Sequence, residues 1–466
     1  MATTAKPTAS NGSRWSRWLA SGRGRRLAIG VAVGWIALVG VTIWRMQSLD
    51  GLPDVGDPFE VTEAGRPVEI PDADNAFVAY AAAKAKLGNT RNQVDDARMT
   101  LLWDSVWNND LKPLTWSLAS TDLRDDLEAK RAALEVWREG SGRRDALYHQ
   151  PGLMKINTRL SLMPDTIHFA GLATLEGSRL EDAGKQDEAW DWYHAILRSS
   201  RLVGRHGGFV QRLYGERIHA LAVRCILRWA ADPRVGATQL RRALHDTLTA
   251  DALTPPVSEA IKIDYLMAFR PVENMTDFEG MMRSSGLMIP LAGGREMGLL
   301  DRLVPWGAVR LPVQRMRLGA SNELERARRA FRLLFANWLA QVDRPAGRRA
   351  PLALRKPIWI YADDPSAPAA ARAVTPEFLA RVLDRSEIAA MLFLDRSVQS
   401  DPPWEGGGEL ARERRRRSVL IVRLAAELYR RERGAAPATA GALLETILEE
   451  LPEGIAAADS IPASLE

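Results

Sequence analysis

An acidic residue stands three positions before a histidine at three places in the sequence: Asp165 and His168, Asp191 and His194, and Glu216 and His219. A Glu-x-x-His pattern on facing helices is how di-iron bundles hold metal ions, because the two side chains share one helix face. Ligands of this kind must project into the core. These pairs are therefore metal ligands only if their helices turn them inward.

The helical periodicity argues against that orientation. At about 100° per residue, Ala189 and Tyr193 lie on one apolar face, and Asp191 and His194 lie roughly opposite. Glu216 likewise points away from the apolar face of 218–229, and His219 stands at its border. We therefore expect solvated side chains and predict no metal site.

Other chemical signatures are missing from the sequence. It contains no Walker phosphate loop, no dinucleotide fingerprint after a strand, no H-E-x-x-H and no G-x-S-x-G. The single cysteine, Cys225, lies on an apolar helical stripe and is expected in the core. We predict no catalytic residue and no cofactor.

The stretch "RRLAIGVAVGWIALVGVTIW" bears on whether the chain is anchored in a membrane. Residues 27–44 carry no charge, and a helix of eighteen residues spans about 27 Å, close to the thickness of a bilayer core. The preceding residues 1–26 hold six basic residues and no acid, which is typical of a cytoplasmic flank. The sequence predicts a single-pass signal anchor in the cytoplasmic (inner) membrane, with the main domain exported to the periplasmic side.

Three alternatives to this anchor stay open: a cleaved signal peptide, a buried helix of a soluble protein, and an inverted topology. No A-x-A cleavage pattern follows the span, which favours an anchor over a signal peptide. Gly30 and Gly34 fit the small-xxx-small pattern of packed membrane helices, so a weak homodimer is a further possibility. The lipid bilayer is the first predicted partner.

The charge of the chain lies mainly in its N-terminal tail. The net charge is +5, and the tail contributes six positive charges, so residues 27–466 carry −1. Nucleic-acid binding requires a basic face on the folded domain itself. We predict no nucleic-acid partner.

The rest of the chain has helical periodicity and almost no strand alternation, which predicts an all-α fold. Residues 45–71 are rich in Gly and Pro and read as a linker; 72–283 form a helical domain and 284–466 a C-terminal helical region. Asp72 or Asp74 is expected to cap the first helix. "PIWIYA" is a possible short strand. The other helices are expected near 94–109, 121–139, 164–182, 186–205, 209–231, 237–250, 256–283, 321–342, 376–398, 409–433 and 438–451.

One pair of helices, within residues 165–231, resembles a tetratricopeptide repeat. Small and aromatic residues stand where that repeat places them, at Gly177, Leu180, Gly184, Ala189 and Tyr193. The small residues let two antiparallel helices approach, and the tyrosine fills the space between them. The sequence holds one convincing copy, so the resemblance implies a repeat-like hairpin inside a larger α-helical domain.

The basic stretch "ARERRRRSVLIVRLAAELYRRERG" is expected to cover the edge of the core and to pair with its own acids, Glu409, Glu413, Glu427 and Glu432. Binding of an acidic partner or anionic lipid is the alternative.

Together with "EDAGKQDEAWDWY", the stretch 200–233 and the C-terminal "VRLAAELYRRERGAAPATAGALL" resemble large single-pass membrane proteins of Planctomycetes. Tyr429, Arg430, Gly434 and Pro437 match the C-terminal pattern of that group, whereas the residues after Pro437 depart from it. The resemblance implies no activity. We expect an exported, membrane-anchored helical scaffold that binds another envelope protein. The alternative is an enzyme acting on a cell-envelope polymer or lipid.

Overall fold

The computed structural model describes residues 51–87, 115–155, 157–273, 322–343, 409–444 and 446–462, with a few positions between 26 and 49. The tail 1–25, the helices expected near 94–109 and 376–398, and the "PIWIYA" strand lie outside the described residues. So do most of the expected membrane span and most of 284–408.

The described chain is helical, as expected for an all-α fold, and its β structure is one isolated bridge between Asn75 and Asp145. Most of the longer helices agree with the predicted ranges to within a few residues, whereas the helix expected at 256–283 is described only to Glu273 and the expected 438–451 helix shrinks to the short α21. These helices are α3 (Val61–Ala64), α4 (Ala76–Leu87), α6 (Thr121–Ser141), α7 (Met163–Asp182), α8 (Gln186–Val203), α9 (Phe209–Ala231), α10 (Ala237–Asp251), α11 (Val257–Glu273), α15 (Glu323–Val342), α20 (Glu409–Arg433) and α21 (Gly441–Leu444).

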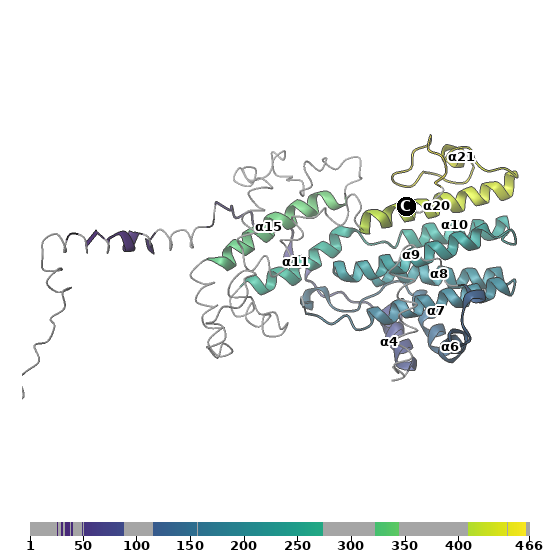
Figure 1. The fold of residues 1–466 in the computed structure, drawn as a ribbon, viewed down its shortest axis with the longest axis horizontal. Helices are drawn as coiled ribbons and strands as arrows, with labels where there is room; N and C mark the ends of the chain where they lie inside the picture. Colours follow the sequence, from purple (N-terminus) through teal and green to yellow (C-terminus); the bar gives the residue numbers. More distant parts are fainter. Residues whose placement is uncertain are drawn as a thin grey trace, which may run out of the picture.

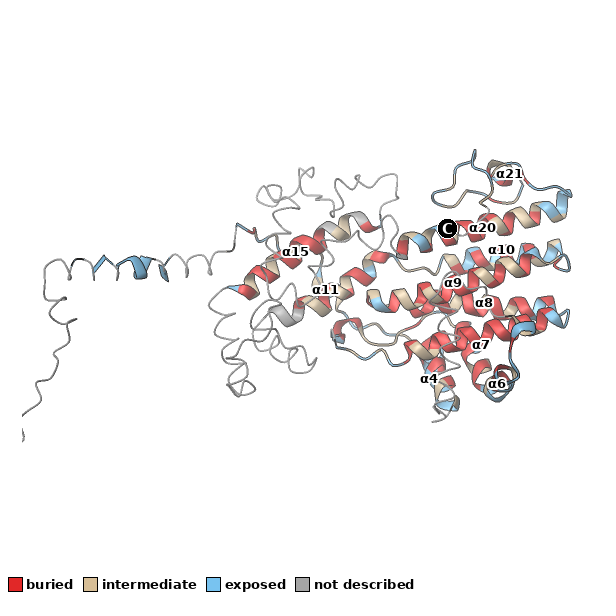
Figure 2. Ribbon diagram, viewed as in Figure 1, coloured by how far each residue is buried: buried red, intermediate tan, exposed pale blue. Residues whose placement is uncertain are grey.

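The helices α7, α8 and α9 form the centre of a bundle, with α6 and α4 on one side and α10 and α20 on the other (Figure 1). Buried residues line the faces where these helices meet (Figure 2). Large aromatic side chains fill the centre: Trp137, Trp190, Tyr193 and Trp229 are almost fully buried. The Trp190 and Trp229 rings lie 5.1 Å apart between α8 and α9.

The α7–α8 hairpin brings its small and aromatic residues together as the sequence predicts. A Cβ atom on Gly177 would overlap the ring of Tyr193, so only glycine allows this approach. Gly184 has a different role from the expected one: no heavy atom lies within 4 Å of a Cβ built on it, but its φ of 77° requires a glycine in the connecting turn. Close packing and turn formation are thus divided between the two glycines.

The helix α4 is capped at its N-terminus by a residue other than the expected one. The side chain of Asn75, not of Asp72 or Asp74, accepts the Phe77 N–H at the start of α4. The same amide exchanges two hydrogen bonds with the backbone of Leu147. Asn75 therefore joins the start of α4 to the loop after α6, a tertiary role that the local sequence does not reveal.

The expected linker 45–71 packs against the folded helical region, which we call the body, from residue 52 onward. Arg332 of α15 contacts Asp54 at 2.8 Å and Asp57 at 3.1 Å, and the Tyr265 hydroxyl donates to Asp57 at 2.9 Å. Gln150 exchanges two hydrogen bonds of 2.9 Å with the backbone of Val68. The predicted linker therefore packs against the helices over this part of the segment.

Within the described part of the chain, no helix is long and apolar enough to cross a membrane. Residues 27–44 are described only at scattered positions. At these positions Ile29, Val33, Trp35, Ile36 and Val39 are all exposed.

Candidate functional site

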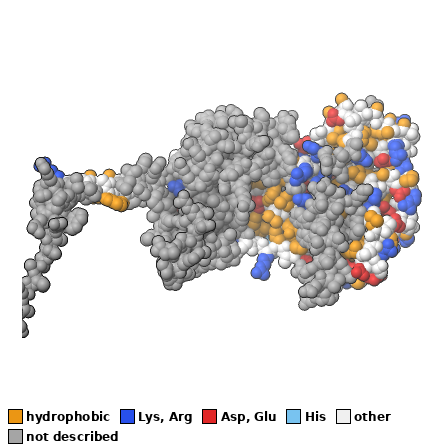
Figure 3. Space-filling model, in the orientation of Figure 1, with side chains coloured by type: hydrophobic (Ala, Val, Ile, Leu, Met, Phe, Trp, Pro, Cys, Tyr) orange, Lys and Arg blue, Asp and Glu red, His pale blue; other side chains and the backbone are white. Residues whose placement is uncertain are grey.

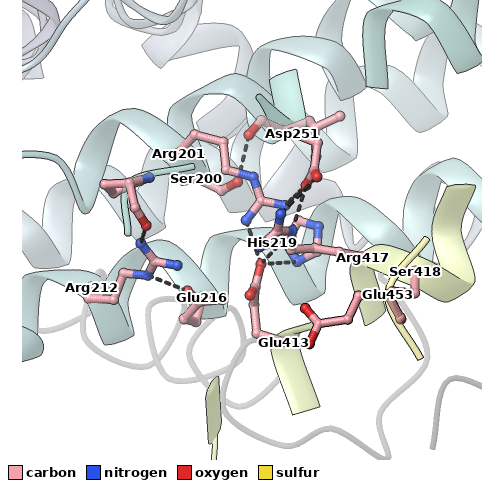
Figure 4. A network of polar contacts seen from close by, with 12 residues as sticks. Ser200, Arg201, Arg212, Glu216, His219, Asp251, Glu413, Arg417, Ser418 and Glu453 are labelled. Carbon is pink, nitrogen blue, oxygen red and sulfur yellow. Dashed lines mark hydrogen bonds and ion pairs between the residues drawn. The ribbon is translucent and has the colours of Figure 1, made fainter. Parts of the chain in front are cut away.

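Charged side chains from four helices meet inside the bundle, where α8, α9 and α10 contact α20 (Figure 4). We call this group the buried charged cluster. It consists of Arg201, Arg212, Glu216, His219, Asp251, Glu413 and Arg417.

The carboxylates of the cluster are bound by arginines. Arg201 contacts Glu413 at 2.6 Å and Asp251 at 3.5 Å. Arg417 reaches both oxygens of Asp251, at 2.5 and 2.8 Å. One turn apart on α9, Arg212 donates to Glu216 at 2.7 Å. These contacts tie the C-terminal helix α20 to α8 and α10.

The arginines keep the buried acids ionised. Burial alone would raise the pKa of Glu413, but the nearby guanidinium groups of Arg201 and Arg417 outweigh it, so the pKa lies below its usual value. The same balance lowers the pKa of Asp251. The cluster is thus a set of true ion pairs in the core.

His219 contradicts the expectation of a solvated side chain. Its exposed fraction is 0%, and that of Glu216 is 3%. Burial, and then the charge of Arg201, hold the pKa of His219 well below its usual value, so the imidazole is neutral. The helical-face argument fails here because α20 covers the side of α9 that α8 leaves open.

A metal ion is the first function to test for this group. One ligand atom each from Glu216, His219 and Glu413 lies within 4.8 Å of the others. Both His219 nitrogens and Glu216 Oε2 have no hydrogen-bond partner among the described residues. These atoms have the chemistry of metal ligands.

The charges around these atoms argue against a metal ion. The carboxylates of Glu216, Glu413 and Asp251 are already balanced by three guanidinium groups, so a divalent ion would add two uncompensated charges in the core. The Oε1 atoms of Glu216 and Glu413 are also engaged by arginines. The residues fit an ion-paired structural core better than a metal centre.

The two other acid–histidine pairs lie apart from the cluster. Asp165 pairs with Lys84 at 2.6 Å, and Asp191 pairs with Arg242 at 2.6 Å. His194 stacks on Trp190, and burial lowers its pKa. The part of the chain that the structure describes does not join the three pairs into one site.

His168 is also buried, with an exposed fraction of 6%, so the expectation of a solvated side chain is wrong there too. Cys225 and part of α20 have the expected roles. Cys225 is buried, and burial raises the pKa of its thiol. On α20, Glu427 pairs with Arg430 of the same helix as expected, whereas Glu432 pairs with Arg241 of α10. Basic and acidic side chains are interspersed over the bundle on the face shown in Figure 3.

A surface pocket of about 450 Å³ lies between the docked linker and α11. Its volume is in the range of sites that take small molecules. The lining residues are Phe59, Glu60, Glu63, Ala64, Arg66, Pro67, Val68, Pro151, His206, Glu259, Lys262 and Ile263.

One carboxylate–imidazole pair reaches this pocket. Asp145 Oδ1 lies 3.1 Å from His206 Nε2 and 2.8 Å from Arg205 Nε. His206 has a φ of 51°, a strained conformation for a residue other than glycine, and such strain clusters at functional sites. A histidine oriented by a carboxylate can act as a general base. No local sequence pattern reveals this pair, because the two residues stand 61 positions apart in loops.

Comparison with known proteins adds no relative. The chain matches no protein-family model, no curated protein and no solved structure. The resemblances to the tetratricopeptide repeat and to the Planctomycetes membrane proteins stay predictions.

Proposed function

We propose that the chain is a membrane-anchored, exported helical scaffold that binds another protein of the cell envelope. The observation that carries the proposal is the row of exposed apolar side chains at Ile29, Val33, Trp35, Ile36 and Val39. Exposing such a row to water is unfavourable, whereas a bilayer accepts it.

The docked segment after the proposed anchor supports a scaffold. Asp54 and Asp57 are bound by Arg332, and Arg329 donates to the Leu52 carbonyl at 2.8 Å. An anchor that continues into a docked segment holds the body at a defined place near the membrane. A scaffold that presents a surface to a second membrane protein benefits from this restriction.

The anchor is tested by the double variant Val33→Lys and Ile36→Lys in the full chain. Each lysine near the centre of a span costs about 2.5–3.5 kcal/mol of insertion free energy, so we expect the variant to leave the membrane fraction. Leu118→Lys is the matched control, because Leu118 and Ile36 are both 72% exposed. Retention of the double variant after alkaline extraction would contradict the anchor.

The orientation is tested with reporters fused to the C-terminus. Export predicts an active periplasmic phosphatase fusion and a dark fluorescent fusion. The opposite pattern would show an inverted topology and overturn the exported scaffold.

The homodimer is proposed through the glycine face of the span. No heavy atom lies within 4 Å of a Cβ built on Gly30 or Gly34. Leucine at both positions should reduce crosslinked dimer in membranes if this face packs against a second copy. Unchanged crosslinking would contradict that contact.

The second candidate function is an enzyme acting on an envelope polymer or lipid, and the Asp145–His206 pair at the surface pocket favours it. His206→Gln should then reduce product release from isolated envelope material by about 100-fold or more. Equal product release by the parent chain and by His206→Gln would show that His206 is not the general base.

A further inference from the structure

The two walls of the surface pocket each carry both signs of charge. Apart from Glu60, which caps α3 by accepting the Thr62 N–H, the linker wall supplies Glu63 and Arg66, and the α11 wall supplies Glu259 and Lys262 one turn apart. The pocket volume lies between these walls. A small molecule in the pocket would therefore meet an acid and a base on either side.

These four charged groups form no ion pair with any described residue. The partner that the structure gives Lys262 is the ring of Phe59, whose centroid lies 5.8 Å from Nζ. Elsewhere on the body, acids and arginines at comparable exposure do pair, as Asp191 and Arg242 do at 2.6 Å. The pocket thus keeps opposite charges available and apart.

We propose that this pocket binds a small zwitterion that carries both an ammonium and a carboxylate group, such as the free ends of a short peptide. Charged groups of both signs around the pocket create a local field that orients a dipolar ligand. Apolar surface from Phe59, Val68 and Ile263 contacts the uncharged middle of the ligand.

Lys262 is the group that binds the carboxylate of the ligand. Its side chain is part-buried and lies over Phe59, so it is the more restricted of the two cations. Glu259 and Glu63 then receive the ammonium group. Because Glu63 belongs to the docked linker and Glu259 to α11, the ligand joins the two segments.

Calorimetric titration of the full chain in detergent with alanyl-alanine tests the proposal. The dipeptide carries both charges and no charged side chain. A ligand of this size is expected to bind with a Kd of about 0.1–1 mM. N-acetyl-alanyl-alanine lacks the ammonium and alanyl-alaninamide lacks the carboxylate, and each should bind at least about tenfold more weakly.

Variants locate the binding to the pocket. Lys262→Ala and Glu259→Gln should each weaken dipeptide binding about tenfold. Arg241→Ala, which removes an exposed pair between α10 and α20, is the control that should leave it unchanged. Equal affinity for the three ligands, equal affinity of the variants, or no binding of the dipeptide would overturn the proposal. Membrane fractionation is independent of all three results, so failure here leaves the scaffold proposal standing.

Discussion

The buried charged cluster and the surface pocket have similar charges and opposite arrangements. Each holds three acidic residues together with basic ones. In the cluster, each of the three carboxylates contacts a guanidinium group within 3 Å. In the pocket, Glu63, Arg66, Glu259 and Lys262 have no ion-pair partner among the described residues.

The difference follows from burial. A charge in the core must be paired, because removing it from water costs several kcal/mol. A charge beside an open pocket stays hydrated and needs no partner within the protein. We infer that the cluster serves the fold and that the pocket serves binding.

The largest effect is expected for Glu413→Gln in the cluster. The substitution leaves Arg201 buried without its closest carboxylate, and breaking such a pair costs about 3–5 kcal/mol of unfolding free energy. Urea unfolding of the full chain in detergent, followed by circular dichroism, measures the loss.

The matched control for that variant is Glu432→Gln on the same helix. Glu432 pairs with the exposed Arg241, so its loss should cost about 1 kcal/mol or less. Similar losses for both variants would show that the cluster contributes no more than a surface ion pair.

A smaller loss is expected for Gly177→Ala, which tests apolar packing in the same bundle without changing any charge. The added methyl group would overlap the buried Tyr193 ring and force α7 and α8 apart. Overpacking of this kind costs about 1–3 kcal/mol. Thermal unfolding of the parent chain and of Gly177→Ala measures the difference in stability. A variant as stable as the parent would show that the hairpin tolerates a wider spacing.

Acid should destabilise the cluster through His219. Its pKa is well below the usual value of about 6.5, so below that pH the unfolded chain binds a proton that the folded chain does not. Stability from this group is present above about pH 6.5 and is lost as the pH falls. His219→Leu should reduce the loss of unfolding free energy between pH 8 and 5, and an unchanged pH profile would contradict the assignment.

Asp264 on α11 should give the unfolding free energy the opposite pH dependence. Burial raises its pKa to about 7, although the Phe209 N–H that it accepts acts against this. Its contribution to stability is therefore lost as the pH rises through 7. Asp264→Asn should make the chain relatively more stable above pH 7 and leave the His219 effect unchanged. A variant less stable than the parent at pH 8 would contradict the raised pKa.

The smallest stability effect is expected in the pocket. Lys262→Ala removes a charge without an ion-pair partner, so the unfolding free energy should change by about 0.5 kcal/mol or less. Unfolding under the conditions used for Glu413→Gln measures it. A loss of several kcal/mol would show that Lys262 serves the fold, and the contrast between the two regions would fail.

Local sequence patterns predict the helices well. The apolar spacing of 186–231 gives α8 and α9 nearly to the residue, and Gly177 with Tyr193 predicts the close contact of the hairpin. These features depend on residues within one or two helices. Helical periodicity is therefore enough to find them.

The two charged regions depend on contacts far apart in the sequence. Arg201 and Glu413 stand 212 positions apart, so the spacing around Glu216 and His219 gives no sign that α20 will cover them. The pocket likewise requires residues 59–68 to dock on α11, whereas the Gly and Pro residues of 45–71 predict a linker. Tertiary partners override the helical-face argument in the first case and the composition argument in the second.

The contrast between the two regions is tested most directly by hydrogen exchange of the full chain with and without saturating alanyl-alanine. We expect slower exchange in residues 59–68 and in α11, with no change in α9 or α20 around the buried charged cluster. Slower exchange centred on the cluster, or no change anywhere, would contradict the division of a structural core from a binding pocket.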